Sequence, residues 1–213
     1  MIIVDEIVDG SSRVLVWRID EDYDTLLSFH PDSFEMDEAA RNRFKSVSRR
    51  LEWLAVRVLL YKALGRNVLI SYASDGAPLL PPSEGMNISI SHTIRRYGDN
   101  LRGYAAIILS PDYNVGIDIE MINQRVDRVK SKFIRDDEVS VTNISSMIHW
   151  SAKESLYKLL RHEGLDFIND LFIHPFEEKD CGVICADEYI TNNRVHVRYW
   201  VSDDYVMTTC HYR

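Results

Sequence analysis

Two acidic residues alternate with apolar ones in the segment VGIDIE at positions 115–120. A strand repeats every two residues, so Asp118 and Glu120 would point to one face and the apolar side chains to the other. The strand rise separates the two acids by about 7 Å along the backbone, which lets both carboxylates reach one cation. Taken alone, the segment is more typical of a half-buried strand with a hydrated acidic face.

A second group of chemically capable residues follows about thirty positions later. Trp150, Glu154 and Lys158 recur every four residues and would form one stripe on a helix. Glu154 and Lys158 at this spacing also fit a simple solvent-exposed ion pair. However, two strand acids and one helix acid suit a hard divalent cation, and Lys153 and Lys158 would add positive charge for a phosphate. The pattern therefore favours metal-assisted phosphate chemistry.

Three further side chains are candidates for binding an anion. The alternating segment ISISHT at 88–93 ends near His92, a position more typical of a structural or exposed histidine. Arg50 and Arg57 are seven residues apart on one expected helix and share a face. Such arginines are usually solvated, but their planar guanidinium groups are also suited to holding a phosphate.

Helices and strands of mixed order must position these residues. Apolar residues recur at three- and four-residue spacing over 37–64, and Gly65 would end that helix. Helical segments are also expected over about 125–141 and 146–161, and a polar loop at 95–102. Expected strands lie at 12–19, 68–72, 87–91, 104–109, 115–120, 182–190, 195–201 and 205–211. This order predicts an α+β fold.

A turn at 111–114 suggests a midpoint, with an N-terminal half over residues 1–110 and a C-terminal half over 111–213. The segments WLAVRVLLYK from Trp53 and WSAKESLYK from Trp150 are weakly similar, although their spacing slips. Together these features predict two similar α/β halves related by a pseudo-two-fold axis. The active site would lie at their interface.

The composition excludes several classes of protein. The 213 residues include 25 Lys and Arg against 33 Asp and Glu, for a net charge of −8, which argues against a general nucleic-acid binder. No apolar stretch approaches the roughly 20 residues that span a bilayer, and the start lacks a signal-peptide pattern, so no membrane association and a cytoplasmic location are expected. The three cysteines are expected to be free thiols, without zinc-site spacing.

The ordered pair of motifs, VGIDIE at 115–120 and WSAKESLYK at 150–158, resembles the paired signature of the 4′-phosphopantetheinyl transferases. Ser91 and His92 lie in a segment that looks like the serine–histidine motif of this family. RRLEWLAVR at 49–57 and GAPLLP at 76–81 are similar to its earlier motifs, especially in the enterobactin-type branch. The resemblance covers roughly residues 49–158 and implies the larger, surfactin-type monomer of two similar α/β halves.

The resemblance also implies a reaction and a set of roles. The protein would transfer the 4′-phosphopantetheine arm of coenzyme A to a serine of an apo acyl or peptidyl carrier protein, releasing 3′,5′-adenosine bisphosphate. Asp118, Glu120 and Glu154 would hold Mg²⁺. Glu154 would also be the base and Lys158 would stabilise the leaving group, so that Glu154, Lys158 and Asp118 form the catalytic set. The implied contacts to coenzyme A are Ser91, His92, Lys153 and Lys158, with Arg50 and Arg57 at its 3′-phosphate end.

Two features depart from the surfactin-type pattern or extend it. Ala77 stands where that branch commonly has a lysine. The loop 93–102 is longer than usual and is expected to be a disordered surface loop. Its three arginines are candidates to replace the lost charge: Arg95, Arg96 and Arg102. A basic group over 125–135 is a candidate docking surface for an acidic carrier protein, and it equally fits a solvated amphipathic helix. Its members are Arg125, Arg128, Lys130, Lys132 and Arg135.

Two other functions remain open from the sequence. One is a non-catalytic module that binds coenzyme A or a carrier protein, against which the four residues Asp118, Glu120, Glu154 and Lys158 argue, because binding alone would not require them all. The other is a metal-dependent phosphohydrolase, in which water would replace the carrier serine. Release of pantetheine phosphate without transfer would favour this second alternative.

Overall fold

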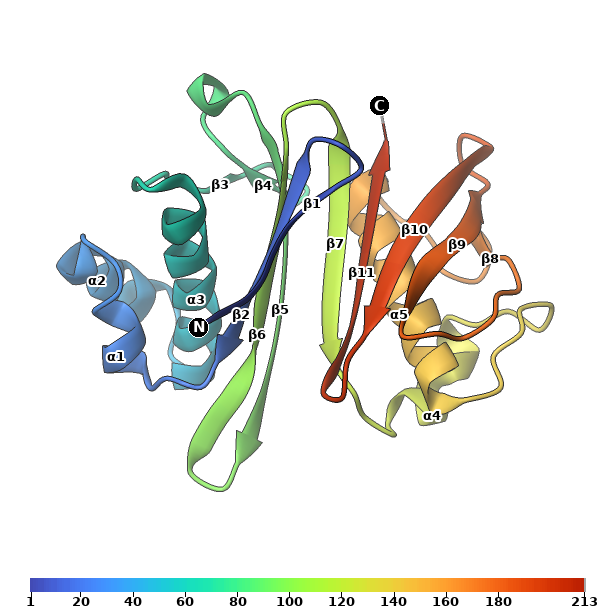
Figure 1. The fold of residues 1–213 in the computed structure, drawn as a ribbon, viewed down its shortest axis with the longest axis horizontal. Coiled ribbons are helices and arrows are strands. Elements are labelled where there is room, and N and C mark those ends of the chain that lie inside the picture. The colour runs from blue at the N-terminus through green and yellow to red at the C-terminus, as the bar shows by residue number, and fades with distance from the viewer. Residues whose placement is uncertain (213) are drawn as a thin grey trace.

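Two antiparallel sheets form the centre of the computed structural model, which describes residues 1–212 (Figure 1). The first sheet has the strand order β1-β2-β6-β5 and the second the order β7-β11-β10-β9-β8. The first half of the chain contains β1 (Ile2–Val8), β2 (Ser12–Ile19), α1 (Tyr23–Leu27), α2 (Ser33–Arg43), α3 (Val47–Leu64), β3 (Ser71–Tyr72), β4 (Pro78–Leu79), β5 (Asn87–Tyr97) and β6 (Asn100–Ser110). The remainder contains β7 (Asn114–Met121), α4 (Val126–Val129), α5 (Asn143–Leu160), β8 (Leu171–Ile173), β9 (Cys181–Glu188), β10 (Asn193–Val201) and β11 (Tyr205–Tyr212). This arrangement confirms the predicted α+β class.

The elements stack as helix, sheet, sheet and helix. One apolar core joins α3 to the first sheet, and a second joins α5 to the second sheet. A third core lies between the sheets and takes side chains from β2, β6, β7 and β11, so these strands are covered on both faces. Figure 1 shows β5 and β7 running side by side where the sheets meet. Because burial on both faces favours continuous apolar runs, β2 and β6 read as nearly unbroken hydrophobic segments.

The two long helices have defined ends. Gly65 follows α3 in a left-handed conformation with φ of 69°, and its backbone N–H donates to the Tyr61 carbonyl. Thr142 caps the start of α5, where its side chain accepts a hydrogen bond from the Ser145 N–H. Neither helix, nor any other over residues 1–212, is long and apolar enough to cross a membrane.

Several expected elements were wrong in extent. The single helix expected over 37–64 is divided into α2 and α3, because Phe44 is extended and Arg50 donates to the Phe44 and Lys45 carbonyl groups at the break. The expected loop at 95–102 is the end of a long β5–β6 hairpin, turning at Gly98 with φ of 59°. Only Val126–Val129 is α-helical within 125–141, and β1 and β8 were not anticipated.

Candidate active site

A glycine allows the strand with the two acids to approach α5 closely. A Cβ atom on Gly116 of β7 would lie 2.0 Å from the backbone oxygen of Ser155 on α5. The neighbouring residues on the same face, Asp118 and Glu120, contact side chains of this helix. Gly116 is therefore required for the close packing that places the acidic face of β7 against α5.

Asp118 lies at the centre of the arrangement and is only 3% exposed. Its Oδ1 atom accepts hydrogen bonds from Lys158 Nζ at 2.8 Å and from Ser91 Oγ at 2.9 Å. Lys158 Nζ also donates to the Ile117 carbonyl at 2.9 Å. The other carboxylate oxygen, Oδ2, is buried and has no hydrogen-bond partner within residues 1–212. The Asp118 carboxylate is therefore paired with one cation, but only one of its two oxygens accepts hydrogen bonds from the described residues.

Glu120 and Glu154 flank Asp118 and carry perturbed carboxyl groups. Glu120 Oε1 accepts from the indole N–H of Trp150 at 3.2 Å. Burial, together with the charge of Asp118, raises the pKa of Glu120 to about 7. Burial and the charge of Asp118 also raise the pKa of Glu154, whereas the positive charge of Lys158 acts to lower that pKa. The three acids thus interact electrostatically with one another and with one cation, Lys158.

The three acids do not form a complete ligand set by themselves. Within the described chain, no three His, Cys, Asp or Glu side chains lie together closely enough to hold a metal ion. Electrostatic coupling extends over longer distances than metal–oxygen bonds, so the raised pKa values and this separation are compatible. Any cation at this position would need further ligands, such as water or substrate oxygens.

Two serines of β5 connect the first sheet to the acidic strand. Ser89 Oγ and Ser91 Oγ accept hydrogen bonds from the backbone N–H groups of Ile117 and Ile119, each at 3.2 Å. Because no strand within residues 1–212 pairs with this edge of β7, the serine side chains satisfy the backbone donors that a neighbouring strand would otherwise bind. Ser91, expected to contact coenzyme A, is buried and instead orients Asp118.

A cleft of about 940 Å³ opens beside these residues. It is lined by the 74–82 segment, the start of β5 and the C-terminal end of α5, including Lys158. A second cavity of about 240 Å³ shares Gly76, Pro78 and Ile90 with the cleft, so the two are neighbours. Its other lining residues include Arg43, Arg49, Glu52, Trp53, Arg57, Tyr72 and His92.

The second cavity gathers positive charge, although not from the pair of arginines that was expected. The Arg57 guanidinium lies 3.6 Å from the centre of the Trp53 ring, and Arg43 lies 5.2 Å from that of Tyr72. Arg50, predicted to share the task with Arg57, is not among the lining residues, since its guanidinium is bound to backbone carbonyls at the end of α2. Arg43 was missed because the expected continuous helix gave no reason to single it out.

His92 and Ala77, which the family resemblance singled out, each line one of the two cavities. His92 lines the smaller cavity, and its Nδ1 atom is 3.5 Å from Glu52 Oε1. Ala77 lines the larger cleft, where Asp75 forms two hydrogen bonds with Arg161, at 2.9 and 3.0 Å. Arg161 therefore brings a cation to within two residues of the position where the surfactin-type branch has a lysine. Arg95, one of the three arginines expected to replace that charge, instead donates to the backbone of Met121 and Ile122, whereas Arg96 and Arg102 are exposed.

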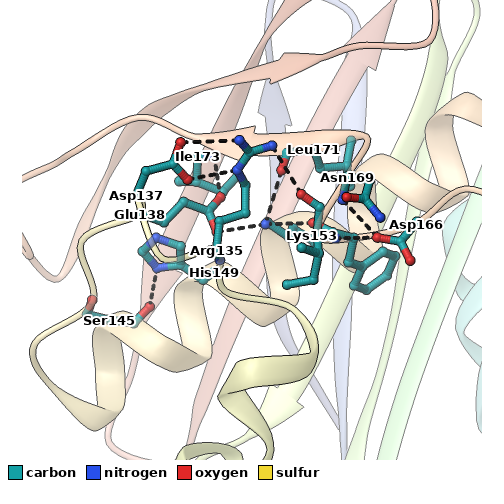
Figure 2. A network of polar contacts seen from close by, with 12 residues as sticks. Arg135, Asp137, Glu138, Ser145, His149, Lys153, Asp166, Asn169, Leu171 and Ile173 are labelled. Atoms are coloured by element: carbon teal, nitrogen blue, oxygen red, sulfur yellow. Dashed lines mark hydrogen bonds and ion pairs between the residues drawn. The ribbon is translucent and has the colours of Figure 1, made fainter.

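Lys153 does not fit the predicted role of a coenzyme A ligand. Its side chain has no exposed surface, and its ammonium group is bonded to Glu138 and to two backbone carbonyls (Figure 2). Lys153 lies on the face of α5 that packs into the second sheet's core, whereas Lys158 reaches the cleft. The sequence motif places the two lysines close together, but the helix directs them to different surroundings.

Comparisons with known proteins bear directly on this site. No curated protein sequence matches the chain. Residues 114–210, slightly less than half of the chain, match the family model described as the 4′-phosphopantetheinyl transferase superfamily. The matched region contains Asp118, Glu120, Glu154 and Lys158, and it begins at the first residue of β7. The chain therefore contains a domain of the 4′-phosphopantetheinyl transferase superfamily, which supports a transferase activity that moves phosphopantetheine.

Proposed function

We propose that this protein transfers the 4′-phosphopantetheine arm of coenzyme A to a serine of an acyl or peptidyl carrier protein. The observation that carries this proposal is Lys158, which lines the cleft of about 940 Å³ and is paired with the buried Asp118, while Glu120 and Glu154 interact electrostatically with both residues. A superfamily that acts on carrier proteins with coenzyme A supports the choice of substrates. We assign the cleft to coenzyme A.

The donor set fits a divalent cation of the magnesium type. Asp118 Oδ2 is a buried oxygen without a hydrogen-bond partner among the described residues, and the pKa values of Glu120 and Glu154 are raised by burial and by the charge of Asp118. Mg²⁺ commonly uses one or two carboxylates together with water and substrate phosphates, so it does not require three acids that all reach it directly. Asp118, Glu120 and Glu154 would hold it together with water and substrate oxygens. When bound, it would neutralise charge on the pyrophosphate oxygens.

The side chains of this protein supply the remaining chemistry. The carrier serine oxygen forms a bond to the phosphorus that carries pantetheine, and the bond from this phosphorus to the bridging oxygen breaks. Glu154 accepts the serine proton. Because a bound cation would lower the raised pKa of Glu154, its effect as a base depends on its position beside the serine rather than on that pKa. Lys158 stabilises the negative charge that develops on the leaving 3′,5′-adenosine bisphosphate.

The smaller cavity is our candidate for the 3′-phosphate end of coenzyme A. Arg43, Arg57 and His92 line it, and the only carboxylate among its lining residues, Glu52, is bonded to Arg49. Burial lowers the pKa of Arg57, yet a guanidinium group remains protonated at any physiological pH. A phosphate would therefore meet positive charge with little competition from acids.

The segment between β7 and α5 is our candidate for carrier-protein docking. Arg128, Lys130 and Lys132 are exposed there, and so are the apolar side chains of Val139 and Val141. An acidic helix with an apolar stripe would complement such a surface.

We further propose that residues 1–110 and 111–213 are the two halves of a pseudo-two-fold arrangement, in which α3 and α5 each pack against one sheet, and that the protein acts as a monomer.

The decisive experiment is to incubate the protein with coenzyme A, Mg²⁺ and several apo carrier proteins, and to measure the intact mass of each carrier. A mass increase of one phosphopantetheine group supports transfer, and its loss with a chelator supports the metal. Binding of coenzyme A without any mass increase would instead favour a binding module. Release of pantetheine phosphate into solution would favour a hydrolase.

A further inference from the structure

Lys153 forms a buried ion pair that is unavailable to any ligand in the cleft. Its Nζ atom lies 2.8 Å from Glu138 Oε2, 2.8 Å from the Phe167 carbonyl and 3.3 Å from the Leu171 carbonyl. An ammonium group has three donors, and all three are used here. Both side chains of the pair have no exposed surface. A role in phosphate binding would require the exchange of three good hydrogen bonds for a ligand outside the core.

Glu138 completes the arrangement from the opposite side (Figure 2). Its Oε1 atom accepts from the Ile173 N–H at 2.6 Å, and its Oε2 atom accepts from the Arg135 N–H at 2.8 Å as well as from Lys153. The Arg135 side chain then donates to the Ile168 carbonyl at 3.1 Å. The pair thus ties three parts of the chain together: α5, the segment before it, and the 166–173 segment that enters β8.

The tied segments hold the tryptophan that contacts the acidic strand. The Trp150 ring packs edge-on against Phe167, whose carbonyl binds Lys153, with ring centres 5.9 Å apart. On another side it packs against Phe133, at 5.1 Å. The indole N–H of Trp150 donates to Glu120. A continuous set of contacts therefore leads from the Lys153–Glu138 pair through Trp150 to Glu120.

We infer that Lys153 and Glu138 are positioning residues, which set the orientation of Trp150 and thereby of Glu120 for the transfer reaction. This inference rests on the proposed function, because it assigns a task within that reaction. It also connects the docking segment to the catalytic helix, since Glu138 belongs to the segment that carries Val139 and Val141. Lys153 acts through these contacts and does not touch coenzyme A.

The test uses the double variant Lys153→Met/Glu138→Gln, which removes both charges and keeps a carbonyl oxygen for the Ile173 N–H. The matched control is Lys179→Met/Glu177→Gln, which removes an exposed ion pair of the same residue types. Glu138→Gln alone is a second variant that keeps Lys153 and its two carbonyl contacts, and it is expected to be less stable than the double variant because the buried ammonium loses its carboxylate. Near-ultraviolet circular dichroism identifies the variants that retain a folded core.

Two readouts separate positioning from ligand binding. Steady-state kinetics give kcat and KM for coenzyme A, and we expect kcat to fall by about tenfold or more while KM stays within about threefold. Fluorine NMR of protein labelled with 5-fluorotryptophan reports on the surroundings of Trp150, whose resonance is assigned from the spectrum of Trp150→Phe. We expect that resonance to move in the Lys153 and Glu138 variants and to stay in place in the control.

Each possible result of these measurements either supports or overturns the inference. An unmoved Trp150 resonance or an unchanged kcat overturns the inference, and so does a rise in KM without a fall in kcat, because that pattern indicates direct contact with coenzyme A. If the wild-type protein transfers to no carrier, the proposed function fails. The fluorine spectrum then decides separately whether the pair positions Trp150.

Discussion

Glu120 provides a sharp test of the electrostatics of the acidic cluster. Burial, with a further contribution from the charge of Asp118, raises its pKa from 4.5 to about 7. Between these two pH values the folded protein binds more protons at this site than the unfolded chain does. The free energy of unfolding must therefore decrease as the pH rises through this window. The stabilising contribution is complete below pH 4.5 and is lost as the pH passes 7.

The magnitude follows from the size of the shift. One pKa unit corresponds to about 1.4 kcal/mol, so raising the pH from about 5 to about 8 should cost the wild-type protein about 2–3 kcal/mol at this residue. Glu120→Gln removes the titration and keeps a carbonyl oxygen for the Trp150 indole. The variant should therefore gain about 2–3 kcal/mol relative to the wild type over the same pH range.

The assay is urea unfolding of both proteins at several pH values between 5 and 8, with a chelator present. Glu38→Gln is the control, because it removes an exposed carboxylate from α2. Groups outside the acidic cluster titrate equally in both proteins, so the difference between the two curves reports on the cluster around Glu120. Stability curves for the wild type and Glu120→Gln that run parallel across this range would refute the account of a buried, charge-coupled glutamate.

Magnesium extends the same experiment. A cation among the carboxylates favours their charged forms and binds only the folded protein, so it should restore stability to the wild type at pH 8. Glu120→Gln has one ligand fewer and should gain less. An equal response of both proteins to the metal would remove Glu120 from the metal site.

Three further predictions concern neighbouring contacts. Lys158→Met leaves buried Asp118 without its cation, so the free energy of unfolding measured with urea should fall by about 3 kcal/mol and transfer should be lost. An unchanged free energy of unfolding would contradict the pairing. Gly116→Ala places a methyl group 2.0 Å from the Ser155 oxygen and should lower the melting temperature or prevent folding, whereas a normal melting temperature would show that α5 does not pack so closely. Arg161→Ala breaks an exposed pair with Asp75, so stability should change by less than about 1 kcal/mol, while calorimetry should detect weaker, less salt-dependent binding of coenzyme A.

Local periodicity was sufficient to predict which side chains share a face on β7 and on α5. The alternation over 115–120 gives the strand face of Asp118 and Glu120, and the four-residue spacing gives the helix stripe of Trp150, Glu154 and Lys158. The structure places these two sets of side chains against each other, as the contacts from Lys158 to Asp118 and from Trp150 to Glu120 show. Both patterns depend only on the repeat of a single element, which a sequence displays directly.

Contacts between distant segments were not predictable in this way. Ser91 bonds to Asp118 across 27 positions, and Glu138 reaches Ile173 across 35. Nothing in the local sequence of Arg43 indicates that the chain bends at Phe44 and leaves its side chain beside a cavity. These outcomes depend on how sheets and helices pack together, which residue spacing alone does not specify.

The assignment of Lys153 could have been improved from the sequence. Lys153 lies four residues after His149 and three before Leu156, and both of these neighbours are buried on α5. The helical repeat therefore places it on the apolar face, away from the stripe of Glu154 and Lys158. A lysine in such a position needs a buried carboxylate, so an acid from another segment was to be expected.

The two lysines of α5 show how charge balance distinguishes a structural pair from a reactive one. Lys153 meets one carboxylate, all of its donors are used, and no charge is left over. Lys158 is partly exposed and interacts with three carboxylates, one of which has a buried oxygen that no group in the described part of the chain hydrogen-bonds. A fold gains nothing in stability from such excess negative charge, because each buried charge must be compensated. Protonation relieves part of this excess, as the raised pKa of Glu120 shows, and the proposed metal ion would relieve the rest from outside the chain. This difference in charge balance favours chemistry at Lys158 and a structural role at Lys153.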